Sequence, residues 1–67
     1  MIITINDQTR SLNDSSTLFD LLQTIQLAEQ RGIAVAVNAE VVARASWSGF
    51  NLQEMDQVTI IQATQGG

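Results

Sequence analysis

Val58-Thr59-Ile60-Ile61-Gln62-Ala63 has the composition of a buried β-strand, because β-branched residues dominate it. Val58 and Ile60 would lie on one face, and the two-residue period of a strand would place Thr59 and Ile61 on the other. A strand whose apolar face is turned toward a helix is expected in the middle of a sheet. The segment therefore predicts a central strand, with Ile61 and Thr59 on the open face of the sheet.

The amino-terminal half of the chain predicts a hairpin followed by one helix. Residues 2–5 alternate between two faces, residues 6–8 make a turn, and residues 9–12 return as a second strand. Thr17 stands three residues before Asp20, which is an amino-terminal capping pattern. Apolar residues then follow at helical spacing and would face the sheet: Leu18, Leu21, Leu22 and Ile25.

The carboxyl-terminal half completes a mixed sheet. Residues 35–37 predict a third strand, which turns into a short strand at residues 41–42. Residues 46–51 look irregular or 3₁₀-helical, with Trp47 and Phe50 pointing into the core. Parallel pairing of the first and last strands would centre both. We predict an α+β fold: a single β-grasp (ubiquitin-like) domain with a mixed sheet of about five strands packed on one helix.

Length and charge narrow the classes of partner. A chain of 67 residues forms one domain and buries only about 60% of its unfolded surface, so a deep pocket is not expected. The net charge of −4 opposes phosphate backbones and anionic membranes, and we expect neither nucleic acid nor a membrane as partner. No segment approaches the ~20 apolar residues of a membrane span, and no signal-peptide pattern occurs. We expect a cytoplasmic protein, with which the lack of cysteine agrees.

The side chains offer no catalytic machinery. The chain has no histidine, cysteine or lysine, so it lacks a nucleophile–base pair and a Schiff-base amine. No glycine-rich phosphate loop with its lysine is present, and the scattered acidic residues do not suggest a metal site. We therefore predict no catalytic residue, no metal and no bound cofactor. Arg44 is expected to pair with a carboxylate such as Glu40, to lie free on the surface or to contact a partner.

The chain ends in Gln65-Gly66-Gly67, directly after the last predicted strand. We predict a β-grasp domain over residues 1–63 and a flexible tail over residues 64–67, which extends on the order of 13 Å. Glycines without Cβ atoms can enter a channel that closes on the backbone. The carboxylate of Gly67 is an anion at neutral pH and needs activation by a partner enzyme that uses ATP. An ordinary frayed terminus is the alternative.

Several motifs together resemble the ThiS family, the small sulfur carriers of thiamin thiazole biosynthesis. The similarity covers the whole chain, and its most specific part combines a Val-Asn-x-Glu-x-Val-x-Arg pattern at residues 37–44 with the terminal Gly-Gly. Ala39 and Ala43 stand where the family often has glycine and proline, and Met55 stands where it usually has glycine. These three departures fall at turn positions. The motifs that carry the resemblance are residues 35–44, Ser46-Trp47, Leu52, residues 55–58 and Gly66-Gly67.

The resemblance implies a cycle of chemistry on Gly67. An E1-like ThiF-type adenylyltransferase would adenylate Gly67 with ATP, and a sulfurtransferase or cysteine desulfurase would supply the sulfur of a thiocarboxylate. Thiazole synthase would then accept that sulfur. Gly66 and Gln65 would complete the tail that enters these enzymes, while Ile61 and Thr59 are the candidate docking residues.

Three other classes remain open at this stage. Molybdopterin-type sulfur carriers share the fold and the Gly-Gly end, but they are typically longer and carry prolines that this chain lacks. A ubiquitin-like modifier would join its terminus to lysines on target proteins, and the absence of lysine from this chain favours the carrier. A regulatory β-grasp domain would make the terminal glycines incidental.

Overall fold

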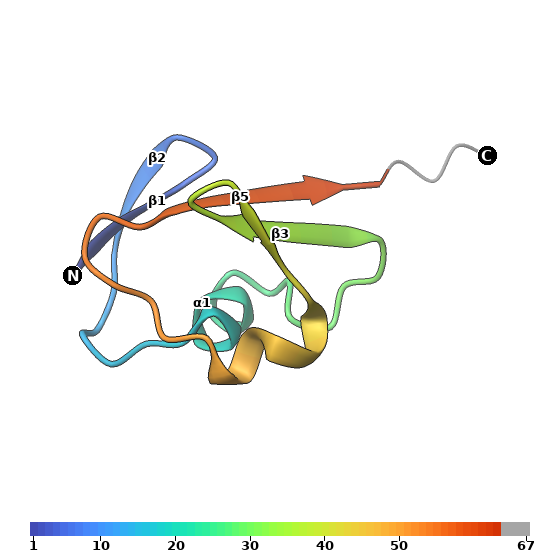
Figure 1. The fold of residues 1–67 in the computed structure, drawn as a ribbon, viewed down its shortest axis with the longest axis horizontal. Helices are drawn as coiled ribbons and strands as arrows, with labels where there is room; N and C mark the ends of the chain where they lie inside the picture. The colour runs from blue at the N-terminus through green and yellow to red at the C-terminus, as the bar shows by residue number, and fades with distance from the viewer. Residues whose placement is uncertain (64–67) are drawn as a thin grey trace.

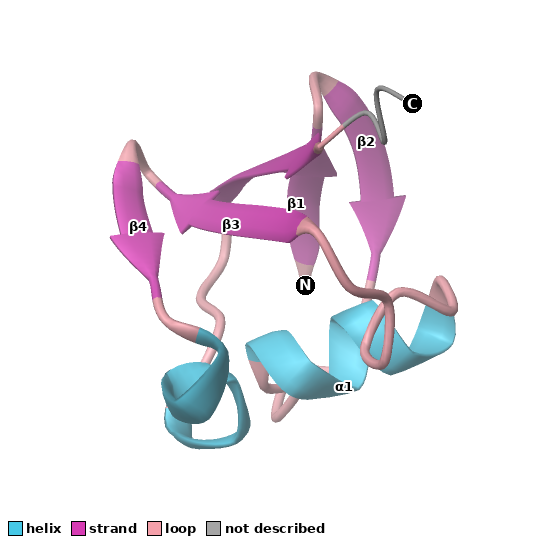
Figure 2. Cartoon of the chain, turned by 90° about the vertical axis from the view of Figure 1, so that its right-hand side faces the viewer, coloured by secondary structure: helices cyan, strands magenta, loops and turns pink. Residues whose placement is uncertain are grey.

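A five-stranded mixed sheet of order β2-β1-β5-β3-β4 packs on one α-helix in the computed structural model, which describes residues 1–63. Figures 1 and 2 show that α1 and the 3₁₀-helix η1 lie on the same side of this sheet. The predicted fold is therefore confirmed. The elements are β1 (Ile2–Ile5), β2 (Gln8–Ser11), α1 (Leu18–Thr24), β3 (Ile33–Val37), β4 (Glu40–Val42), η1 (Arg44–Gly49) and β5 (Gln57–Gln62).

The first and last strands pair in parallel at the centre of the sheet, as predicted. Thr4 lies opposite Gln57 and Ile5 opposite Val58, and the Thr4 amide donates to the Asp56 carbonyl over 3.0 Å. On its other side β5 pairs with β3 in antiparallel register from Val37 opposite Val58 to Ile33 opposite Gln62. The last strand is therefore held along its length by β3, and at its first two residues, Gln57 and Val58, by β1 as well.

The helix begins at the predicted capping pattern. The Asp20 amide donates to the Thr17 hydroxyl over 3.1 Å, and the Thr17 amide donates back to the Asp20 carboxylate over 3.0 Å. The apolar stripe of Leu18, Leu21 and Leu22 is fully buried. Ile25, the last residue of the predicted stripe, is the C-cap of the helix; it is half-buried and packs against the core.

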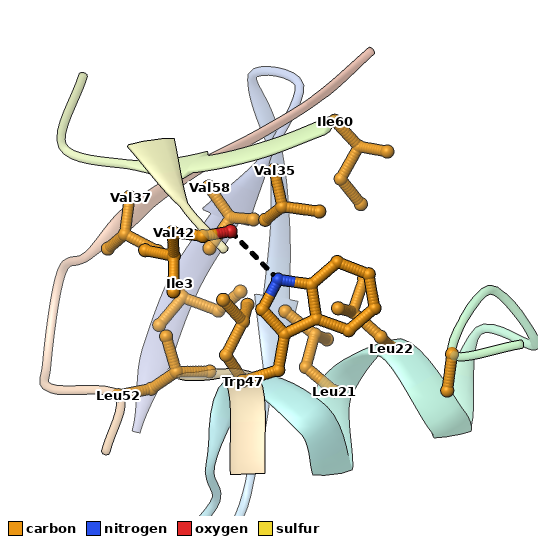
Figure 3. Close-up of a cluster of buried hydrophobic side chains, with 12 residues drawn as sticks. Ile3, Leu21, Leu22, Val35, Val37, Val42, Trp47, Leu52, Val58 and Ile60 are labelled. Carbon is orange, nitrogen blue, oxygen red and sulfur yellow. Dashed lines mark hydrogen bonds between the residues drawn. The ribbon is translucent and has the colours of Figure 1, made fainter. Parts of the chain in front are cut away.

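Trp47 closes the core from the side opposite the sheet. Its side chain is 2% exposed, and its indole N–H donates to the Val42 carbonyl over 3.0 Å. Figure 3 shows the ring lying among core side chains from α1 and the sheet. Phe50 is only half-buried against this cluster, so it lies at the edge of the core. The inward position predicted for Trp47 is confirmed.

Two hairpins turn through left-handed backbone conformations. The β1–β2 turn has φ of 49° at Asn6 and 70° at Asp7, and the β3–β4 turn has φ of 53° at Asn38 and 70° at Ala39. A two-residue turn with positive φ at both positions follows the twist of the strands it joins. Met55, before β5, also has a positive φ of 71°. The backbone at Ala39 and Met55 thus has the conformation that favours glycine, although neither residue is one.

Candidate functional site at the carboxyl-terminal strand

The end of β5 is anchored on both sides. The Ala63 amide donates to the Gly32 carbonyl over 2.6 Å on the β3 side. On the other side, the Asn6 side chain accepts from the Ile60 amide over 2.8 Å and donates to the Ile60 carbonyl over 3.2 Å. The point from which the terminal segment leaves the domain is therefore well defined. The tail residues predicted from the sequence, Gln65, Gly66 and Gly67, lie outside the described residues.

The two faces of β5 are divided as the sequence predicts. Val58 and Ile60 are 1% and 9% exposed and pack in the core, whereas Ile61 is 63% exposed. Thr59 is also exposed, on the same face as Ile61. The predicted placement of both residues is thus confirmed. Their role in docking remains a prediction.

Neighbouring strands extend this exposed surface. Ala34 lies opposite Ile61 in the register, and Ala36 lies opposite both Thr59 and Val41. Val41 is 75% exposed. We call the surface of these five residues the open face; none of them is charged, so a partner can cover it without desolvating an ion. Its members are Ala34, Ala36, Val41, Thr59 and Ile61.

Sequence reasoning missed Val41 and the two alanines. Val41 and Val42 are identical residues in a short strand, and only the pairing of Val35 with Val42 shows that Val42 faces the core. The alanines carry no signal of their own, since a small apolar residue fits either face of a sheet. The β3–β5 register would have been needed to find them.

Several acidic side chains have structural roles. The Asp56 carboxylate accepts from the Gln53 amide over 2.8 Å and from the Asn38 side chain over 2.9 Å. Glu54 accepts from the Ile2 amide over 3.0 Å, and Asp14 forms an ion pair with the amino terminus over 3.0 Å. Across residues 1–63, no three acidic side chains gather into a group that could hold a metal ion. Asp56 thus stabilises the turn before β5, whereas Glu54 and Asp14 hold the amino-terminal residues in place.

Arg44 does not form the ion pair with Glu40 that was one of its expected roles. Its guanidinium donates to the Ala28 carbonyl over 2.7 Å and to the Gln30 carbonyl, and it lies 4.5 Å from the centre of the Trp47 ring. Arg44 begins η1, on the same side of the sheet as the loop that follows α1, so backbone carbonyls of that loop are its partners. The side chain thus links the loop to η1.

Within the described part of the chain, no helix is long and apolar enough to cross a membrane.

Two solved structures share this architecture. The crystal structure of the thiamine biosynthesis protein ThiS from Geobacter metallireducens matches with a TM-score of 0.84 at 23% identity, and the match covers 100% of both chains. A solution NMR structure of a thiamine biosynthesis protein from the same organism matches with a TM-score of 0.78, covering 100% of this chain and 88% of that one. The chain is therefore a small β-grasp domain, with an anchored central strand near its carboxyl-terminal end.

Sequence comparison gives the particular family. A sequence model of the ThiS family matches residues 3–67. The sulfur carrier protein ThiS of Escherichia coli strain K12 is 33% identical over 67 residues, which is 100% of both chains. The chain belongs to the ThiS family, the sulfur carriers of thiamin biosynthesis, and is a carrier protein rather than an enzyme.

Proposed function

We propose that the chain carries sulfur as a thiocarboxylate on Gly67 and delivers it for thiazole formation in thiamin biosynthesis. One observation supports this most directly: β5 is anchored at Ile60 and Ala63, and Ala63 stands four residues before Gly67. Four residues extend on the order of 13 Å, so the terminal carboxylate stays close to the domain surface. An enzyme that binds the domain thereby also positions Gly67.

The chemistry on Gly67 requires partner enzymes. A carboxylate has no leaving group, so an E1-like ThiF-type adenylyltransferase joins it to AMP from ATP and releases pyrophosphate. A sulfurtransferase or cysteine desulfurase then provides sulfur that attacks the acyl carbon and displaces AMP. If that sulfur arrives as a persulfide, a thiol must also reduce the sulfur–sulfur bond. The resulting thiocarboxylate is a nucleophile that thiazole synthase uses as its sulfur source.

The open face is the proposed docking surface for the adenylyltransferase. Ile61 lies two residues before Ala63, so a contact at Ile61 places the enzyme beside the origin of the tail. Burial of an isoleucine side chain stabilises a contact by roughly 1.5–3 kcal/mol. Thr59, on the same face, supplies a hydroxyl that can donate to or accept from a partner.

Intact mass spectrometry tests this function. The chain is incubated with its cognate ThiF-type adenylyltransferase, ATP and a sulfur donor, and its mass is expected to rise by the difference between sulfur and oxygen. A chain that lacks Gly67 is the matched control and is expected to keep its mass. Equal sulfur incorporation into both chains would refute the proposal, and a new covalent bond to another protein would indicate a modifier instead.

A further inference from the structure

The central strand β5 reaches farther than the strand beside it. β1 ends at Ile5, opposite Val58, and the chain then turns away into β2. β5 continues to Gln62, and Figure 1 shows its end running past the β1–β2 hairpin. Beyond Ile60, therefore, one edge of β5 has β3 beside it, and the other has no strand from residues 1–63.

The hydrogen-bond pattern shows which groups lie on that open edge. The Ala63 amide bonds to Gly32, and the Asn38 amide bonds to Gln57, so odd-numbered residues of β5 direct their backbone groups toward β3. Even-numbered residues direct theirs toward β1, because the Val58 carbonyl accepts from the Asn6 amide over 2.9 Å. Since the direction alternates along an antiparallel pair, the N–H and C=O of Gln62 point away from β3.

Asn6 shows where the open edge begins. Its side-chain amide takes the place of a neighbouring strand at Ile60, satisfying both the N–H and the C=O of that residue. Gln62 is the next residue with the same orientation, and within residues 1–63 its backbone groups have no strand beside them. A backbone donor and acceptor are thus presented together in strand geometry.

A recess lined mainly by aliphatic side chains lies directly beside this edge. Four of its six lining side chains are aliphatic and uncharged, and the other two are the residues that bound the open edge. An added strand would direct alternate side chains toward the core side of the sheet, where this recess could hold one of them. The lining residues are Ile5, Asn6, Ile25, Leu27, Ile60 and Gln62.

We propose that the open edge of β5 at Gln62 accepts an extended segment of the adenylyltransferase as an added strand, with one aliphatic side chain in the recess. The inference rests on the proposed function, because it requires an enzyme that holds Gly67. Gly67 lies four residues beyond Ala63, so the enzyme's reaction centre must come within about 13 Å of the end of β5. The enzyme surface around that centre therefore lies near Gln62, whose backbone groups have no strand beside them within residues 1–63 and favour strand addition.

Hydrogen–deuterium exchange of the wild-type chain, resolved to single amides, tests the added strand. In the free chain the Gln62 amide is expected to exchange rapidly, whereas the Ile61 amide, which faces β3, exchanges slowly. Binding of the cognate ThiF-type adenylyltransferase is expected to slow exchange at Gln62 by at least about tenfold. The Ile61 amide serves as the internal reference because it is paired in both states.

Two substitutions at the same residue give an independent measurement. Gln62→Pro removes the backbone N–H without breaking a bond to β3, and proline is tolerated where a strand edge is unpaired. Gln62→Ala removes the side chain and keeps the N–H. Both variants lose the Gln62 side chain, and only Gln62→Pro also loses the N–H. Binding to the adenylyltransferase is expected to be about fivefold or more weaker for Gln62→Pro than for Gln62→Ala, the equivalent of one hydrogen bond.

The outcomes separate this inference from the proposed function. If the wild-type chain is adenylated while Gln62 gains no protection, or while Gln62→Pro binds as tightly as Gln62→Ala, strand addition is refuted and the carrier function stands. If the adenylyltransferase neither binds nor adenylates the wild-type chain, both fail. Should Gln62→Pro not fold, the exchange measurement on the wild-type chain decides.

Discussion

Replacing Ala39 with glycine tests whether the β3–β4 turn is strained. Ala39 has φ of 70°, in the left-handed region, and its side chain is exposed, so the substitution removes no core packing. This conformation is unfavourable for a non-glycine residue by roughly 1–2 kcal/mol, because its Cβ approaches the following carbonyl oxygen. The change to glycine also lowers the stability of the protein by about 0.4–1 kcal/mol, because it increases the conformational freedom of the unfolded chain. The difference predicts that Ala39→Gly stabilises the protein by about 0.5–1 kcal/mol.

Ala43 provides a matched control for this substitution. It is also an exposed alanine four residues along the chain, but its φ is −65°. Ala43→Gly therefore relieves no strain and is expected to destabilise the protein by about 0.4–1 kcal/mol. The same chemical change should have opposite effects at the two sites because only the backbone conformation differs.

Urea denaturation and thermal melting of the wild type and both variants measure the two effects. For a domain of this size, 1 kcal/mol corresponds to a shift of about 4–8 °C in Tm. Ala39→Gly is expected to raise Tm by about 2–8 °C, and Ala43→Gly to lower it by a similar amount. If Ala39→Gly destabilises the protein as much as Ala43→Gly does, the strain argument for the turn is wrong.

Three further predictions concern docking, the tail and the loop after α1. Ile61→Asp is expected to weaken binding to the adenylyltransferase by about tenfold or more with little change in Tm. Ile60→Asp, in contrast, is expected to unfold the protein because it places a charge in the core. Equal destabilisation of the two variants in thermal melts would contradict the assignment of the strand faces. Gly66→Val should leave Tm unchanged and slow adenylation, and adenylation at the wild-type rate would show that glycine is not required there. Arg44→Ala should lower the free energy of unfolding by about 1–2 kcal/mol in urea denaturation, because it removes the contacts with the backbone carbonyls and with Trp47. The control, Arg10→Ala on exposed β2, should change it by less than about 0.5 kcal/mol. Equal effects would show that the Arg44 contacts add no stability.

Local sequence signals predicted the parts of the fold that depend on neighbouring residues. The capping box at Thr17 needs only Asp20 three positions later, and the burial of Val58 and Ile60 follows from the two-residue period of a strand. At Ala39 and Met55, where the family often has glycine, the turn retains the left-handed backbone that favours glycine. These features could be read from short segments because their causes lie within those segments.

Features that depend on the register between distant strands could not be predicted in this way. The choice of Val41 over Val42 for the open face depends on pairing with β3. The edge at Gln62, which no strand of residues 1–63 covers, depends on where β1 stops beside β5. The partners of Arg44 depend on the loop that packs against η1, 14 to 16 residues away in the chain. Each is a long-range consequence of assembly that no local pattern contains.

The position of the anchors on β5 bears on the energetics of the proposed tail chemistry. Fixing the backbone of one residue costs about 1–2 kcal/mol, so holding the tail that the sequence predicts to be flexible, residues 64–67, in an enzyme channel would cost about 4–8 kcal/mol. Burial of Ile61 alone offsets roughly 1.5–3 kcal/mol of this. The rest must come from other contacts on the domain, for which the open face and the edge at Gln62 are available. The anchors at Ile60 and Ala63 already hold the preceding residues in the sheet. Binding therefore has no ordering cost for those residues, and the total cost is lower the closer the strand continues to Gly67.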